Sequence, residues 1–160
     1  MSNSAINLNR RAVLTHIVLV SAVIGIGNAW ADARPAITVW KDPNCGCCGG
    51  WVEHLRRNGF AVTVIETSDV QSVKAQRDVP AELASCHTAE ISGYTIEGHV
   101  PAQAIVRLLA EKPAGRGLAV PGMPIGSPGM EGGTPEPYDV MLFGNGVPAR
   151  FGRYLRDQLI

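Results

Sequence analysis

The stretch "AITVWKDPNCGCCGGWVEHLRRNGFAVTVIET", residues 36–67, predicts how the chain begins to fold. It opens with five β-rich residues, as a short strand does, and "DPN" follows as a turn former. From residue 49 the apolar residues recur at helical spacing, and Asn58 with Gly59 is a helix-stop signal. Residues 60–67 are β-rich again. The pattern therefore predicts a βαβ unit, whose crossover makes its two strands parallel.

The second half of the chain is less regular but still carries clear element signals. They predict, in order, a helix over residues 70–78 capped by Ser68 or Asp69, a strand over residues 94–99, a helix over residues 101–112 and an antiparallel hairpin over residues 138–154 with its turn at Asn145 and Gly146. Together with the βαβ unit, these elements predict an α/β, thioredoxin-like fold with a central mixed sheet and a C-terminal antiparallel hairpin.

A long Gly/Pro loop, residues 115–137, separates the last predicted helix from the hairpin. Structureless loops of this length are uncommon inside a compact domain, where they are usually functional or disordered. The chain holds 18 glycines and 11 prolines in 160 residues, so much of it should be turn and loop.

Residues 1–31 have the pattern of a secretory signal. Two adjacent arginines precede an apolar run, which ends in an Ala-x-Ala exit from Ala29 to Ala31. An uncleaved membrane anchor is the alternative, but the run is marginal for the roughly 20 apolar residues that span a bilayer. We expect cleavage after Ala31, by Sec or twin-arginine export, which leaves residues 32–160 as one periplasmic domain. The membrane would then be a partner only through an uncleaved signal.

Formal net charge is zero, so no excess of basic residues points to nucleic acid as a partner. An exported domain meets an oxidising compartment, where exposed thiols are vulnerable. The four cysteines of the chain must therefore be paired, bound to metal or redox-active.

Three of these cysteines, Cys45, Cys47 and Cys48, fall within four positions at the start of the first predicted helix. The partial positive charge at a helix N-terminus favours thiolates, which are both nucleophiles and metal ligands. Two structural disulfides are one interpretation. A dithiol oxidoreductase that uses Cys45 and Cys48 is a second, but it leaves Cys47 and Cys86 unexplained. A metal site uses all four and is the interpretation that we favour.

All-thiolate sites select zinc, Cu(I) or iron–sulfur clusters. Structural zinc prefers two separated C-x-x-C pairs, and the known four-cysteine iron–sulfur spacings do not match this chain. Cu(I) tolerates low coordination number and bridging thiolates, so the crowded CGCC motif suits it better. Met123 and Met130 in the Gly/Pro loop are soft thioether donors, although a loop methionine also packs on apolar surface.

The histidines of the mature chain divide unevenly. His87 directly follows Cys86, and His99 ends a predicted strand, so both are candidates as direct or supporting ligands. His54 lies two turns into the helix after the cysteines, and we expect it on the surface.

Three motifs in the right order carry a resemblance to a known family. They are "DPNCGCCGGWVEHL" (residues 42–55), "SCHTAEISGYTIEGHVPAQAIVRLL" (residues 85–109) and "GLAVPGMPIGSPGME" (residues 117–131). With these motifs the chain resembles the CopG-type periplasmic metal-binding proteins found with bacterial copper and silver resistance systems. The match runs from about residue 37 to residue 154.

The resemblance implies a thioredoxin-like fold with a copper site whose ligands here would be Cys45, Cys47, Cys48 and Cys86. It further implies that several Cu(I) ions bind as a thiolate cluster, and that Cu(I) and Cu(II) interconvert. Four thiolates around one Cu(I) carry excess negative charge, which several bridged ions would offset.

The sequence thus predicts a periplasmic copper-resistance protein, with silver as a further candidate metal. His87, His99 and Met123 would tune access to the copper or its potential, and a copper efflux system or a periplasmic copper chaperone would be the partner. The alternatives are a metal-free thiol–disulfide oxidoreductase and a passive chaperone that only passes Cu(I) on. Whether the protein is a copper oxidoreductase stays open at this point.

Overall fold

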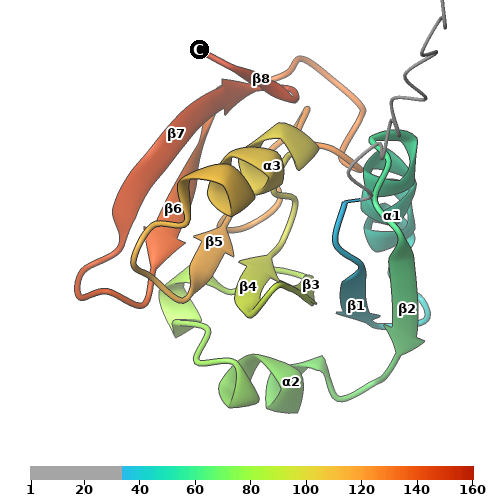
Figure 1. Cartoon of the computed structure of the whole chain (residues 1–160). Helices are drawn as coiled ribbons and strands as arrows, with labels where there is room; N and C mark the ends of the chain where they lie inside the picture. Colours follow the sequence, from blue (N-terminus) through green and yellow to red (C-terminus); the bar gives the residue numbers. More distant parts are fainter. Residues whose placement is uncertain (1–33) are drawn as a thin grey trace, which may run out of the picture. The chain divides into compact units, whose positions relative to one another are not determined.

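The computed structural model describes residues 34–160, and this part of the chain forms one mixed sheet of eight strands flanked by helices (Figure 1). The strand order is β2-β1-β3-β4-β5-β6-β7-β8. In chain order the elements are β1 (Ile37–Lys41), α1 (Gly46–Arg57), β2 (Val62–Glu66), α2 (Val70–Gln76), the 3-10 turn η1 (Ala81–Leu83), β3 (His87–Ile91), β4 (Tyr94–Glu97), α3 (Ala102–Glu111), β5 (Gly117–Ala119), β6 (Tyr138–Phe143), β7 (Ala149–Leu155) and β8 (Gln158–Leu159). The predicted signal segment and the start of the predicted domain at residue 32 lie outside the described residues.

The βαβ unit forms as its sequence predicts. β1 and β2 are parallel, with Ile37 opposite Val62, and α1 crosses between them. The helix over residues 70–78 is confirmed as the shorter α2, whose Asp69 cap accepts a hydrogen bond from the Ser72 N–H. α3 ends before Pro113, as predicted, because Lys112 turns the backbone into the left-handed region at φ 47°.

Three strands were not predicted: β3, β5 and the two-residue β8. β3 lies antiparallel to both β1 and β4, and in its sequence "HTAEI" the strand-favouring residues Thr88 and Ile91 are separated by Ala89 and Glu90, which strands disfavour. β5 is three residues long and lies inside the predicted Gly/Pro loop, parallel to β4. A Cβ atom at Gly117 would come within 1.8 Å of the Thr95 carbonyl oxygen, so the close approach of β5 to β4 requires glycine there. Burial and pairing with distant strands, rather than local preference, create β3 and β5.

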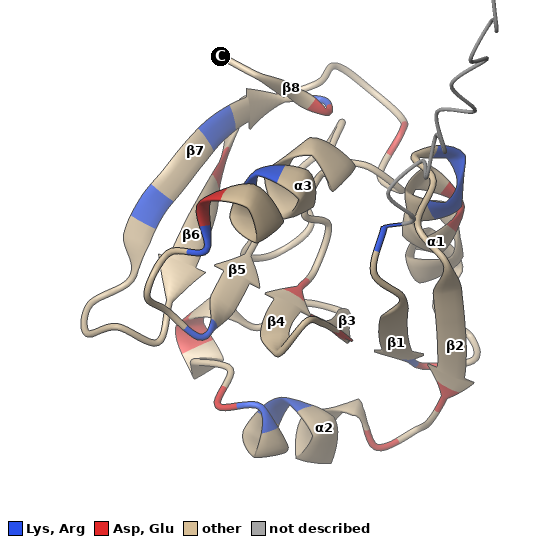
Figure 2. Cartoon of the chain, in the orientation of Figure 1, with Lys and Arg blue, Asp and Glu red and all other residues tan. Residues whose placement is uncertain are grey.

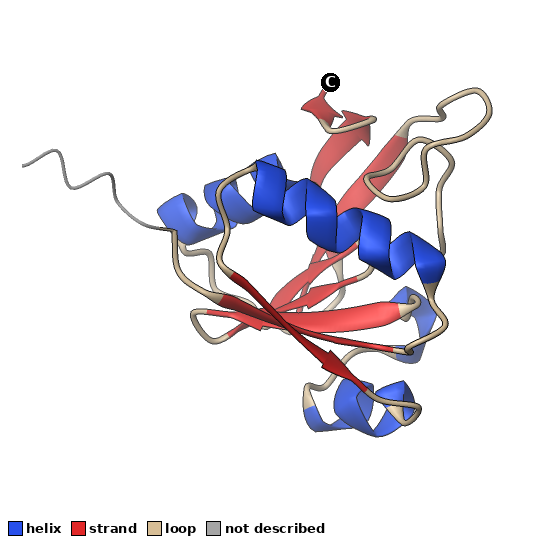
Figure 3. Cartoon of the chain, turned by 90° about the vertical axis from the view of Figure 1, so that its right-hand side faces the viewer, coloured by secondary structure: helices blue, strands red, loops and turns tan. Residues whose placement is uncertain are grey.

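Helices cover both faces of the sheet: α1 and α3 lie on one side and α2 on the other (Figure 3). The main core lies under α1 and α3, where large apolar side chains from helices and strands are fully buried, among them Ile37, Val39, Trp51, Leu55, Ile96, Ile105 and Leu108. Burying each such side chain contributes about 1.5–3 kcal/mol. On the opposite face the Arg77 guanidinium, just after α2, lies 3.8 Å from the centre of the Trp40 ring. None of the helices within residues 34–160 has the length and apolar character needed to cross a membrane.

The C-terminal strands extend the sheet beyond β5. β6 and β7 pair antiparallel, and β8 adds to the outer edge of β7. The turn between β6 and β7 has Gly144 and Gly146 at positive φ, where glycine is the least strained residue. Acidic and basic side chains are spread over many elements instead of gathering on one (Figure 2). Arg150 and Arg153 of β7 both pair with Asp139 of β6.

Candidate metal centre

Two separate parts of the chain bring the four cysteines together. Cys45 is the N-cap of α1, and Cys47 and Cys48 lie in its first turn. Cys86 immediately precedes β3. Because β3 is antiparallel to β1, with His87 opposite Lys41, the start of β3 lies beside the end of β1, where the chain leads into α1. Strand pairing therefore carries Cys86 to the helix N-terminus.

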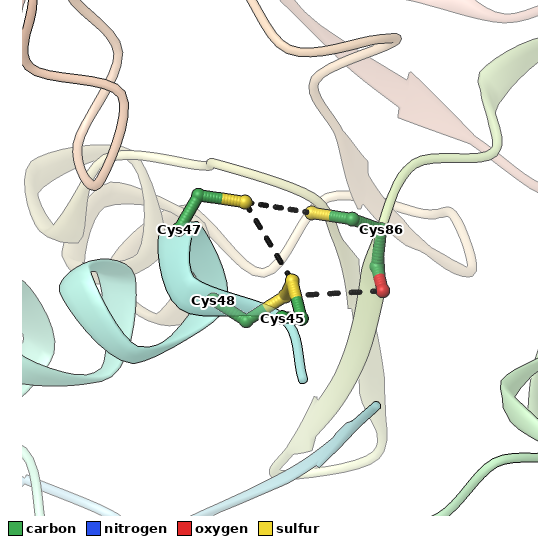
Figure 4. A group of neighbouring side chains, drawn as sticks. All are labelled: Cys45, Cys47, Cys48 and Cys86. Carbon is green, nitrogen blue, oxygen red and sulfur yellow. Dashed lines mark hydrogen bonds between the residues drawn. A yellow bond between two sulfur atoms is a disulfide. The ribbon is translucent and has the colours of Figure 1, made fainter. Parts of the chain in front are cut away.

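The four sulfur atoms form one group, with all of them within 4.8 Å of one another (Figure 4). A disulfide joins Cys45 and Cys48, whose Cα atoms are 5.4 Å apart. The Sγ atom of Cys47 lies 3.6 Å from that of Cys45 and 3.9 Å from that of Cys86. Within residues 34–160, Cys47 and Cys86 are the two free thiols. The predicted site residues are thus neighbours, and two of them are oxidised to the C-x-x-C disulfide.

Two imidazoles border the sulfur group at Cys86. Its Sγ atom lies 3.2 Å from Nδ1 of His87 and 3.2 Å from Nε2 of His99. The other ring nitrogen of His99, Nδ1, lies 2.8 Å from the Pro128 carbonyl oxygen. A carbonyl oxygen can only accept, so Nδ1 of His99 carries the proton and Nε2 presents a lone pair to Cys86. Cys86, His87 and His99 thus form a second group of closely spaced donor atoms.

His87 is completely buried between aromatic neighbours. Its ring lies 4.3 Å from that of Trp51 and 5.0 Å from that of His99, centre to centre. Among the described residues its Nε2 atom has no hydrogen-bond partner. Burial, and then the nearby His99 and Lys74, hold the pKa of His87 well below its usual range. His87 is therefore a neutral imidazole with an uncommitted buried nitrogen.

Burial raises the pKa of the Cys86 thiol to about 11, and the neighbouring Cys47 adds to the rise. The Cys86 thiol therefore holds its proton at neutral pH. A metal ion that binds this sulfur must displace the proton.

The Gly/Pro loop packs directly on the first turns of α1. Gly129 has φ +86°, and a Cβ atom there would lie 2.6 Å from both the Cys47 carbonyl oxygen and the Trp51 nitrogen. On the helix side, a Cβ atom at Gly50 would lie 3.0 Å from Gly129 Cα. These glycines let the loop backbone touch the helix, and the same loop supplies the Pro128 carbonyl that orients His99.

Met123 lies on this loop with 53% of its surface exposed. The preceding residue, Gly122, accepts a hydrogen bond through its carbonyl oxygen from the Ser85 hydroxyl, at 2.6 Å. The predicted supporting methionine therefore lies on a segment bonded to the residue before Cys86, with its side chain turned largely to solvent.

The prediction that His54 lies on the surface is wrong. His54 is buried, and its Nε2 atom accepts a hydrogen bond from the Ala102 N–H at the start of α3, at 3.1 Å. The first N–H groups of a helix have no partner within the helix, and His54 supplies one. Its position three residues after Trp51 places it on the buried face of α1, a signal that helical periodicity already contained.

The sequence analysis also missed two residues that form hydrogen bonds next to the sulfur group, Pro128 and Glu97. Pro128 acts through its backbone carbonyl, which any residue carries, and no sequence pattern marks it. Glu97, completely buried at the end of β4, accepts a hydrogen bond from the Ser85 N–H. A fully buried acidic residue in a strand is unusual, but the strand's burial on both faces is visible only in the fold.

Fold and site together define an α/β protein with a cluster of closely spaced cysteine sulfur atoms and two buried imidazoles at a helix N-terminus. The family described as "Protein of unknown function, DUF411" matches residues 83–130. Two solved structures, described as "Copper resistance protein copG- Form 2" and "Copper resistance protein copG- Form 1", are each 44% identical in sequence, with TM-scores of 0.71 and 0.70. In both comparisons the alignment covers 76% of this chain and 98% of the other. No curated protein sequence matches significantly.

The chain belongs to the CopG family of copper resistance proteins. The resemblance predicted from its three motifs is thereby confirmed.

Proposed function

We propose that the protein handles copper in a copper-resistance system and binds Cu(I) through Cys45, Cys47, Cys48 and Cys86. The observation that carries this proposal is the convergence of four sulfur atoms, from two parts of the chain, within 4.8 Å of one another. Thiolate sulfur is a soft donor that suits Cu(I), zinc and iron–sulfur clusters, and the crowded CGCC spacing favours Cu(I) among them. Family membership supports copper as the cargo, with silver as a second soft ion to test.

Loading the site requires reduction of the disulfide between Cys45 and Cys48. A dithiol donor supplies the two electrons and two protons, becomes a disulfide itself, and leaves four cysteine thiols. Each Cu(I) that binds a cysteine sulfur then displaces the thiol proton. Several Cu(I) ions that share bridging thiolates offset the negative charge better than one does.

The two histidines fit the role of supporting donors. Nε2 of His99 faces Cys86 with its lone pair, and His87 is neutral and buried beside the same sulfur. Imidazole nitrogen suits both copper oxidation states, so these rings favour a protein that interconverts Cu(I) and Cu(II) over one that only stores Cu(I). Met123 is the supporting residue with the weakest geometric argument, since its side chain is mainly exposed.

We further propose that residues 37–111 form a thioredoxin-like unit. The order β2-β1-β3-β4, with α1 and α3 on one face and α2 on the other, supports this assignment (Figures 1 and 3). So does the placement of a C-x-x-C pair at the start of the first helix. Export through residues 1–31 would place the unit in the periplasm, where an efflux system or a copper chaperone would exchange copper with it.

An anaerobic Cu(I) titration of the reduced protein against a chromophoric chelator tests the binding proposal. We expect more than one Cu(I) per chain, with loss of capacity in Cys47→Ser and in Cys86→Ser. A single metal equivalent that is indifferent to Cys86→Ser would contradict the cluster.

A metal-free thiol–disulfide oxidoreductase is the second candidate, and the disulfide at the N-terminus of α1 favours it. The discriminating variant is again Cys47→Ser. A dithiol enzyme that uses Cys45 and Cys48 should keep its disulfide-reductase activity in this variant, whereas a copper site should lose metal. Retained reductase activity with unchanged copper binding would favour the enzyme.

A further inference from the structure

We propose that a buried ion pair between Lys74 and Glu97 positions Cys86 for metal binding. Neither residue belongs to the sulfur and imidazole groups described above, and α2, which carries Lys74, holds no candidate ligand. The effect on copper binding rests on the proposed function. The position of the Cys86 sulfur atom does not, and it can be tested without copper.

The pair is part of a closed polar network inside the protein. Lys74 Nζ lies 2.6 Å from Glu97 Oε1, and the side chains are only 5% and 0% exposed. The Thr88 hydroxyl donates to Glu97 Oε2 at 2.7 Å, and Lys74 Nζ donates to Thr88 Oγ1 at 3.0 Å. Removing one member would leave a buried charge or a buried polar group without its partner, which is strongly unfavourable. The network therefore holds one arrangement of α2, β3 and β4.

This network reaches the cysteine site through one backbone hydrogen bond. The Ser85 N–H donates to Glu97 Oε1 at 2.6 Å, and Ser85 directly precedes Cys86. From the other side, the Ser85 hydroxyl donates to the Gly122 carbonyl oxygen at 2.6 Å. The residue before Cys86 is thus held at two points, one on the buried carboxylate and one on the Gly/Pro loop.

Placement matters more for Cys86 than for the other cysteines. Cys45, Cys47 and Cys48 share one helix start, whose own geometry keeps them together. Cys86 is the sulfur ligand that comes from elsewhere, 39 residues after Cys47, and its Sγ atom lies 3.9 Å from that of Cys47. If the segment before β3 shifts, Cys86 leaves the group while the other three remain.

A second ion pair between the same parts of the fold provides a matched control. Arg77, the C-cap of α2, lies 2.8 Å from Glu90 of β3, but Glu90 is 47% exposed and bonds neither Ser85 nor Cys86. Glu90→Gln removes a carboxylate between α2 and the sheet without touching the segment that carries Cys86. Glu97→Gln makes the same chemical change inside the network.

Cross-linking tests the placement of Cys86 without any copper. In non-reduced protein the disulfide protects Cys45 and Cys48, so a short bifunctional thiol reagent can bridge only Cys47 and Cys86. We expect the bridged product in the wild type and in Glu90→Gln, and its loss in Glu97→Gln. Equal yields in all three proteins would overturn the proposal.

Copper binding to the reduced proteins supplies the second readout. We expect Cu(I) affinity to fall about 10–100-fold in Glu97→Gln, as for other residues that orient metal ligands, and to stay unchanged in Glu90→Gln. In Glu97→Gln the ultraviolet thiolate-to-Cu(I) absorption contributed by the last ion bound should fall together with the affinity. Should the wild type bind no Cu(I), the proposed function fails, whereas the cross-linking result still decides the positioning role.

Glu97→Asp covers the case in which Glu97→Gln does not fold. It keeps the charge for Lys74 but draws the carboxylate back by one methylene from the Ser85 N–H. A folded Glu97→Asp protein, judged by circular dichroism, should lose cross-linking and copper affinity together. Wild-type values for both in the folded variant would reject the proposal.

Discussion

His99 presents Nε2 to the Sγ atom of Cys86 at 3.2 Å, and the tautomer that makes this possible is set by the Pro128 carbonyl oxygen on the far side of the ring. The Gly/Pro loop, whose length in the sequence indicated either a functional or a disordered segment, thereby borders the candidate site. It orients a ring nitrogen from one side and packs on the cysteine-bearing helix from the other. Changes in the loop should therefore alter metal binding, although the loop contributes no cysteine.

Replacing His99 by phenylalanine should keep the packing of the ring and remove its nitrogens. We expect Cu(I) affinity to fall about 10–100-fold, as is usual when a residue beside a metal ligand is lost. A chelator-competition titration measures this change. Cys86→Ser should cost more in the same assay, because it removes a sulfur donor. An affinity equal to that of the wild type would show that His99 has no part in binding.

Gly129→Ala should destabilise the protein and disturb the site. The new Cβ atom would clash with the Cys47 carbonyl oxygen and the Trp51 nitrogen at a positive φ, and such backbone strain costs on the order of 1–3 kcal/mol. Gly122→Ala is the matched control, since Gly122 also has positive φ, +68°, but nothing lies within 4 Å of its Cβ position. Urea unfolding gives the loss of stability in each variant. The loss in Gly122→Ala measures the cost of the positive φ alone, and the additional loss in Gly129→Ala measures the clash. Equal losses would mean that the contact with α1 is not tight.

Stability should fall as pH drops below about 6.5, the ordinary histidine value. Burial lowers the pKa of His54 in the folded protein, so in acid the unfolded chain takes up a proton that the folded chain does not. Neutral His54 also accepts the Ala102 N–H bond, which a protonated ring cannot do. Urea midpoints between pH 7.5 and pH 5 measure the loss.

His54→Gln supplies the comparison for this pH dependence. A glutamine side chain offers an oxygen acceptor to Ala102 but does not titrate. The stability of the His54→Gln variant should therefore fall less steeply in acid than that of the wild type. Part of the fall should remain in both proteins, because the pKa of His87 is also held low. Identical slopes for wild type and variant would remove His54 from the explanation.

Alkylation of Cys86 should be slow at neutral pH and should keep accelerating into alkaline solution. Only the thiolate reacts, and burial raises the pKa of Cys86 to about 11. Iodoacetamide labelling of the non-reduced protein, mapped to each cysteine by mass spectrometry, gives the rate as a function of pH. A rate that levels off below pH 9 would contradict the raised pKa.

Much of the fold up to the end of α3 could be predicted from local patterns. The βαβ unit, α2 with its Asp69 cap and the end of α3 before Pro113 follow from periodicity, capping and stop signals that act within a few residues. β3 and β5 could not be predicted in this way. The residues of β3 have a mixed strand preference, and they form a strand because β1 and β4 flank them. Helical periodicity contained the burial of His54, but its partner, the start of a distant helix, could not be predicted locally.

The sequence by itself determined that three cysteines crowd the start of a helix, because they lie between the turn formers at residues 42–44 and the helical apolar spacing from residue 49. Its three motifs also pointed to the family. Only the tertiary structure decided which groups complete the site. Antiparallel pairing of β3 with β1 brings Cys86 and His87 to the helix, and pairing of β4 with β3 brings His99 beside them. The Pro128 carbonyl of the loop then fixes which ring nitrogen of His99 carries the proton. These contacts join residues far apart in the chain, so they depend on strand register and burial, which no local pattern encodes.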